Sequence, residues 1–278
     1  MFFNKKKEDP NTDLNFLGHL EALRWHLVRV AIAIFLFATA AFIHYDILFD
    51  KILFGPLHTD FITYQWMCKL SENIGIDLCV DQINFSVINL NISGQFIMHM
   101  KGAFIAGLVL SFPYLLWEIW RFIKPALKMN ELRYTRGVVF FGSILFLAGV
   151  SFGYFIISPL SVQFLGNYQV SQTVANQISL DSYISTVTML TLASGIVFEM
   201  PIIVFFLSSI GMMTPEFMNQ YRKHSMIVIL IIAALITPSP DVASQMLVAL
   251  PLFVLYEVSI WVSRMVVKNK RKKELKSL

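Results

Sequence analysis

Long apolar stretches alternate with short polar connections along this chain of 278 residues. Most of the stretches approach the roughly twenty apolar residues that a helix needs to cross a bilayer. The pattern therefore predicts an all-α, polytopic membrane protein with six transmembrane helices. The predicted spans are 27–43, 96–122, 138–160, 183–210, 225–236 and 242–262.

The same pattern divides the chain into three parts. Residues 1–26 form a predicted N-terminal segment with an interfacial helix, residues 27–262 one integral membrane domain, and residues 263–278 a basic tail. The largest connection, 44–95, is predicted to lie outside the spans. The hydrophobic fraction of 56% is used for lipid-facing and interhelical surface.

The fifth stretch is the shortest, because 225–236 is followed at once by a Thr-Pro-Ser-Pro sequence. At about 1.5 Å per residue it would be about 18 Å long, against a hydrocarbon core of about 30 Å. Either the bilayer thins around this helix or neighbouring helices shield its ends.

Lysine and arginine gather on one side of the predicted topology. Of the 22 basic residues, all but Lys51, Lys69 and Lys101 lie in or at the edges of the N-terminal segment, the second and fourth connections, or the tail. The positive-inside rule places both termini in the cytoplasm. Basic loops suit anionic lipid headgroups, and the absence of a soluble domain to carry them argues against a nucleic-acid partner.

The predicted outer segment, 44–95, contains both cysteines of the chain. Cys68 and Cys79 either form a disulfide in an oxidising compartment or remain as two free thiols. Residues 45–57 have helical spacing until Gly55-Pro56, and alternation at 88–92 predicts a short extended piece.

Ionisable residues within the spans are costly in hydrocarbon and therefore candidates for function. Glu199 lies deep in the fourth span, and Pro201 is expected to kink the helix beside it. It is either a hydrated functional carboxyl or a structural hydrogen-bonding group. Glu118 lies nearer a helix end, where a local surface pair with Arg121 would explain it.

Two further carboxylates lie on the predicted cytoplasmic side. Glu21 precedes Arg24 by three residues before the first span, and Glu131 lies among basic residues in the second connection. Such carboxylates can receive guanidinium groups from a ligand in bidentate geometry. Alternatively, Glu131 only compensates nearby Lys and Arg.

Four motifs in this order make the chain resemble the TatC family, the multispanning subunits of the twin-arginine protein translocase. They are HLEALR at 19–24, WRFIKPAL at 120–127 with Glu131 after it, FEMP at 198–201, and TPSPDVASQ at 237–245. The resemblance covers nearly the whole chain. It implies a curved, glove-like arrangement of six helices whose last two are short.

The resemblance also implies a function. Family members bind signal peptides that carry two consecutive arginines and help to export folded proteins, driven by the protonmotive force. The implied partners are those peptides, single-span TatA/TatB-type proteins, further copies of the chain and membrane lipid. The implied location is the bacterial cytoplasmic (inner) membrane.

The family's site residues carry over position by position. One site glutamate corresponds to Glu131, next to a motif that contains Phe122. The other would fall at Ala22, where this chain instead has a carboxylate one position earlier, at Glu21. His19 and Arg24 belong to the same first motif. The remaining matches are intramembrane Glu199 with Pro201, partner-contact position Glu118, and the outer positions Pro56 and Asp241.

A proton-coupled small-solute carrier is the alternative, because it would use the same intramembrane Glu199 and Pro-broken helices. No paired repeat supports it. The sequence has no phosphate-binding loop, no HExxH helix and no GxSxG elbow, so we expect neither an enzyme nor a cofactor or metal.

Overall fold

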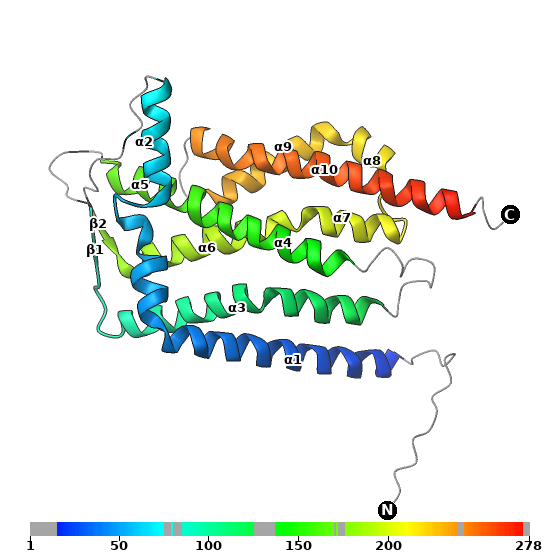
Figure 1. Cartoon of the computed structure of the whole chain (residues 1–278), viewed down its shortest axis with the longest axis horizontal. Coiled ribbons are helices and arrows are strands. Elements are labelled where there is room, and N and C mark those ends of the chain that lie inside the picture. Colours follow the sequence, from blue (N-terminus) through cyan, green and yellow to red (C-terminus); the bar gives the residue numbers. More distant parts are fainter. Residues whose placement is uncertain are drawn as a thin grey trace, which may run out of the picture.

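The computed structural model describes residues 16–74, 79, 85–124, 137–169, 171, 176–237 and 242–274. Long helices run along one common direction and form the body of the molecule (Figure 1). The described start of the first helix and the described end of the last lie at the same end of this bundle, which we call the inner end. The opposite end is the outer end.

The bundle is built from helices that pass along its length. They are α1 (Phe16–Ile43), α3 (Gly94–Ile123), α4 (Val138–Phe152) continued by the π-helix η5 (Gly153–Ile157) and α5 (Ser158–Asn167), α6 (Leu180–Phe198) continued by α7 (Met200–Ser209), α9 (Arg222–Ile236) and α10 (Val242–Glu274). The short helix α8 (Pro215–Gln220) connects α7 to α9 at the inner end.

Five helical stretches among the described residues are long and apolar enough to cross a membrane: Glu21–Ile43, Gly94–Ile123, Val138–Asn167, Leu180–Ser209 and Gln245–Asn269. The predicted all-α membrane architecture is confirmed. The fifth predicted span is present as α9, which has only 15 residues and does not reach that length.

The first and last helices continue beyond the predicted spans. Helix α1 continues without a break across residues 26 and 27, so the predicted interfacial helix and first span are one helix of 28 residues. Helix α10 has 33 residues and ends at Glu274, so the last helix is not short and most of the predicted tail is helical. Residues 263–274 contain no Pro or Gly, and basic side chains are favourable at a helix C-terminus.

Helix packing relies on small residues, as expected where lipid is as apolar as the side chains. A Cβ at Gly107 of α3 would lie 2.5 Å from the backbone nitrogen of Ala38 in α1, so only glycine permits this close approach. One apolar cluster joins α7, α9 and α10 around Ala233, Ala249 and Leu252, all at most 2% exposed. Large exposed side chains such as Phe35 face outward from the bundle.

The outer end is closed by short elements, which we call the outer cap. They are η1 (Ile47–Leu53), η2 (Gly55–Leu57), α2 (Ile62–Ile74), β1 (Ser86–Ile88) and β2 (Gln177–Ser179). The two strands pair in parallel, with Ser86 opposite Gln177. A strand is present next to the predicted extended piece at 88–92, but it shares only Ile88 with it, so that prediction is wrong in position. Sequence patterns indicated neither α2 nor β2.

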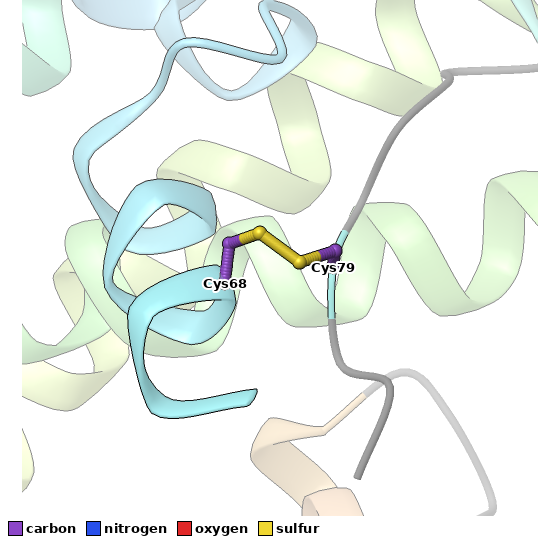
Figure 2. Close-up of a disulfide and its surroundings, with 2 residues drawn as sticks. All are labelled: Cys68 and Cys79. Atoms are coloured by element: carbon purple, nitrogen blue, oxygen red, sulfur yellow. A yellow bond between two sulfur atoms is a disulfide. The ribbon is translucent and has the colours of Figure 1, made fainter. Parts of the chain in front are cut away.

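Side-chain bonds join the outer cap to the bundle. The Tyr183 hydroxyl donates to the Leu53 carbonyl at 2.8 Å, and the Tyr64 hydroxyl donates to the carbonyls of Pro56 at 3.0 Å and Pro159 at 3.2 Å. Burial raises the pKa of Tyr64. Figure 2 shows the disulfide that links Cys68 of α2 to Cys79, with Cα atoms 4.4 Å apart. The outer cap is thus held by covalent and polar links.

Candidate functional site

The inner end of α1 presents an exposed carboxylate. Glu21 and Arg24 are both exposed, whereas Ala22 is half-buried. Among the described residues, none bonds to either charged side chain, so the two do not pair with each other. Glu21 is therefore open to an incoming group, while the neighbouring position at Ala22 faces partly into the protein.

One turn farther along, a polar network joins α1 to α3. His26 Nδ1 donates to Oε2 of Glu118, the Tyr114 hydroxyl donates to Oε1 at 2.9 Å, and the nearest guanidinium nitrogen of Arg29 lies 3.9 Å from Oε2. The Glu118 side chain is only 1% exposed. A buried carboxylate is stable when its oxygens have such partners.

The predicted surface pair of Glu118 with Arg121 is wrong. Glu118 faces α1, where it is covered, whereas Arg121 is exposed and lies over the Trp117 ring, with Cζ 5.6 Å from the ring centroid. A pair at spacing three forms only when both side chains share one exposed face of the helix. Here helix α1 covers the face of α3 that carries Glu118, whereas Arg121 lies on an exposed face.

His26 also contacts Phe122 near the end of α3. The two ring centroids are 5.9 Å apart and the rings meet edge to face. We call the set His26, Arg29, Tyr114, Glu118 and Phe122 the inner junction. It brings one predicted peptide-binding residue, Phe122, against α1, and its central member His26 was not among the predicted site residues. The sequence signal that could have identified His26 was its position just before the first predicted span, at a depth similar to that of Glu118 in the next span.

Some predicted site residues cannot be placed. Glu131 and Asp241 lie outside the described residues, and so does the side chain of His19, although its backbone belongs to α1. Phe122 of the inner junction lies one residue before the end of α3, after which the connection containing Glu131 begins. Pro56 is placed in η2, fully buried, where its carbonyl accepts the Tyr64 hydroxyl.

The second buried glutamate marks the break between α6 and α7. Glu199 separates the two helices, Pro201 stands at the start of α7, and the predicted kink is confirmed. The residue is 8% exposed, and neither carboxylate oxygen has a hydrogen-bond partner among the described residues. A Cβ at Gly142 of α4 would lie 3.3 Å from Oε2, so this glycine leaves room for the carboxylate.

Other chemistry is not evident in the described part of the chain. There, no group of three or more His, Cys, Asp and Glu residues is arranged to hold a metal ion. A cavity of about 950 Å³ lies at the outer cap, lined by aromatic residues that include Tyr45, Phe49 and His99. It lies at the opposite end of the bundle from the inner junction.

Comparison with known proteins agrees with this architecture. A model of the TatC family, described as Sec-independent protein translocase protein, matches residues 18–251. A TatC protein of Blattabacterium is 38% identical over 270 residues, which cover 96% of this chain and 99% of the relative. The TatCy protein of Bacillus subtilis is 33% identical over 260 residues, which cover 93% of this chain and 92% of that protein.

Solved structures give the same result. A crystal structure of the twin-arginine translocase receptor TatC has a TM-score of 0.62 and 30% identity, covering 90% of this chain and 99% of that one. A second, in DDM, has a TM-score of 0.67 and 32% identity, covering 88% and 99%. The chain therefore belongs to the TatC family and is a multi-pass cytoplasmic-membrane component of the Sec-independent protein translocase.

Proposed function

We propose that the inner ends of α1 and α3, together with the connection between α3 and α4, bind the arginine pair of an export signal peptide. Glu21 and Glu131 accept the two guanidinium groups, and Phe122 packs beside the peptide. Arg24 and His19 complete the α1 side of this site. Planar guanidinium and carboxylate groups pair in bidentate geometry, which selects arginine over lysine.

The observation that carries this proposal is the open Glu21 carboxylate. Glu21 is exposed and no described residue bonds to it, whereas the buried Glu118 has its oxygens occupied. His26 lies five residues after Glu21, about 7.5 Å along the helix, and contacts Phe122. Along the axis of α1, Glu21 is thus about one and a half turns from the level at which α3 ends.

The inner end is assigned to the cytoplasm. The excess of Lys and Arg in the connections there supports this orientation. Helix α1 begins and α10 ends at the same end of the bundle, which supports an even number of crossings (Figure 1). Six crossings follow if α9 spans a thinned or shielded region, and the integral domain then extends from α1 through α10.

Single-span TatA/TatB-type proteins are proposed to meet the face around Glu199. Its two oxygens have no hydrogen-bond partner in the described part of the chain, which leaves hydrogen-bonding capacity for a polar group of another helix. An apolar cavity of about 420 Å³ lies beside it, lined by Ile196, Met200 and residues of α9 and α10. Glu118 is not part of this contact, because it is buried and fully bonded. Lipid and further copies of the chain cover the remaining apolar surface.

The protonmotive force is the proposed energy source. One elementary charge that moves across 100 mV releases about 2.3 kcal/mol. The carrier alternative is not retained, because the family match covers nearly the whole chain and that family is a protein translocase.

Binding of labelled peptides to the purified protein in nanodiscs tests the recognition site. An Arg-Arg signal peptide should bind at least about tenfold more tightly than its Lys-Lys counterpart, because lysine cannot form the bidentate pair. Glu21→Gln and Glu131→Gln should each reduce this preference. Glu216→Gln, which removes another exposed carboxylate at the inner end, is the matched control.

Photocrosslinking from positions 21 and 131 locates the bound peptide directly. Labels at both positions should capture the Arg-Arg peptide and not the Lys-Lys peptide. Equal capture of the two peptides, or an equal loss of binding in the Glu216→Gln control, would overturn the assignment.

A further inference from the structure

Helix α1 lies at the edge of the bundle and depends on α3 for its placement. None of the described side chains of α1 is buried, and α1 packs along α3 at one border of the molecule (Figure 1). Apolar contacts between helices in lipid provide little preference for one rotation over another, because lipid tails are equally apolar. The rotation of α1 therefore needs a directional contact.

The inner junction supplies that contact. The bond from His26 Nδ1 to Oε2 of Glu118 joins residues 92 positions apart on two helices, and the Arg29 guanidinium of α1 lies near the same oxygen. Tyr114 binds the other oxygen from within α3 itself. Within the inner junction, the His26 and Arg29 interactions therefore link α1 to α3, and the His26 contact is the direct hydrogen bond. At the outer ends of the same helices, His99 of α3 donates to the Phe42 carbonyl of α1 at 3.1 Å, so the inner junction fixes the inner end of α1.

The position of this bond relates it to peptide binding. Phe122 follows Glu118 by about one turn of α3, and Glu21 precedes His26 by about one and a half turns of α1. A rotation of α1 by one residue, about 100°, would change the direction in which Glu21 points relative to Phe122. The His26–Glu118 bond is thus close in sequence to both Glu21 and Phe122, whose relative placement the peptide site requires.

We infer that His26 and Glu118 are positioning residues for signal-peptide recognition, which hold the inner end of α1, and with it Glu21, at a fixed rotation relative to Phe122 of α3. This inference rests on the proposed function of the same site. Neither residue is assigned a contact with the peptide, since the bonded Glu118 side chain is almost fully covered. The pair acts through the groups that it orients.

A double-mutant cycle tests the pair. His26→Ala and Glu118→Ala should each weaken Arg-Arg peptide binding by about tenfold, the loss expected when a hydrogen bond to a charged group is removed. The double variant should bind no worse than either single variant, because the residues act as one unit. Additive losses, or single variants that bind like the unmodified protein, would contradict the inference.

Tyr114→Phe is the matched control. It removes a hydrogen bond from the same carboxylate but leaves the link between α1 and α3 intact. Its peptide affinity and its preference for Arg-Arg over Lys-Lys should stay unchanged. If this variant loses as much affinity as His26→Ala, the link between the helices is not the cause. Should Glu118→Ala not fold, His26→Ala and this control decide the question.

Covalent rescue separates positioning from general stability. In the double variant H26C/E118C, a short bis-maleimide cross-linker replaces the missing bond between α1 and α3. The native cysteines are joined in a disulfide and do not react. Peptide affinity should be low before cross-linking and largely restored after it. A cross-linked protein that remains weak would overturn the inference.

A measurement without peptide distinguishes this inference from the proposed function. Spin labels at positions 25 and 121, both exposed, report the distance between α1 and α3 by double electron–electron resonance. The distance distribution should broaden in His26→Ala and stay narrow in Tyr114→Phe. If the unmodified protein binds the two peptides equally, the proposed function fails. If the distance distribution stays narrow in His26→Ala, the positioning role is rejected, whatever the peptide result.

Discussion

The inner junction and the break between α6 and α7 each bury one glutamate, but they treat its carboxylate differently. Glu118 is 1% exposed and is bonded by His26 and Tyr114, with Arg29 nearby. Glu199 is 8% exposed and has no hydrogen-bond partner among the described residues. Both residues lie within predicted membrane spans, so burial alone does not distinguish them.

The difference lies in what the surrounding helices provide. At the inner junction, α1 supplies a histidine and an arginine, so the carboxylate contributes to the structure by joining two helices. At the break, α4 supplies a glycine, which leaves space and no donor. A buried polar group without a partner is costly, and it persists where function requires it. We therefore propose a structural role for Glu118 and a partner contact for Glu199.

Removal of the Glu118 carboxylate should have the largest effect on stability. Glu118→Ala leaves His26 and Arg29 without their buried partner, and breaking such a pair costs about 3 kcal/mol. The free energy of unfolding, measured by denaturation in detergent micelles, should fall by this order. A loss below about 0.5 kcal/mol, the range of ordinary surface changes, would show that the junction is not structural.

Filling the space beside Glu199 should have the next largest effect. A Cβ at Gly142 would lie 2.4 Å from Cδ2 of Leu116 as well as 3.3 Å from Oε2 of Glu199. Gly142→Ala should therefore reduce the free energy of unfolding by about 2 kcal/mol through overpacking. Ser143→Ala, at the adjacent position of α4, should change it little. Equal free energies of unfolding for the two variants would mean that Leu116 and Glu199 can move aside to accept a methyl group at position 142.

Tyr114→Phe should cost less, because the carboxylate keeps its bond from His26. The loss of one hydrogen bond to Glu118 predicts a reduction of about 1 kcal/mol in the free energy of unfolding. Peptide binding should not change. The same denaturation measurement checks this value, and a loss as large as that of Glu118→Ala would show that Tyr114 is the main partner.

Glu199→Gln should have the smallest effect on stability and a clear effect on export. No bond is lost on substitution, so the free energy of unfolding should stay within about 0.5 kcal/mol of its original value. Export of a folded reporter with an Arg-Arg signal peptide should fall, because the ionisable group is gone. Unreduced export would favour a purely structural role for Glu199.

Several features could be predicted from local sequence. The spans follow from runs of apolar residues, and the helix break at Glu199 follows from Pro201 two positions later. Signals for the outer cap were weaker, because β1 depends on pairing with β2, about ninety residues away in sequence. Helix α10 was predicted too short because apolar length indicates where a membrane ends, not where a helix ends.

The sequence by itself determined that this is a multi-pass membrane protein, and its four motifs indicated the TatC family. Hydrophobic length, charge and motif spacing are properties of neighbouring residues and can be read directly. Only the tertiary structure decided that Glu118 is bonded by His26, while Glu199 has no hydrogen-bond partner among the residues that the structure describes. That outcome depends on which side chains other helices bring to each carboxylate, and helix packing sets it.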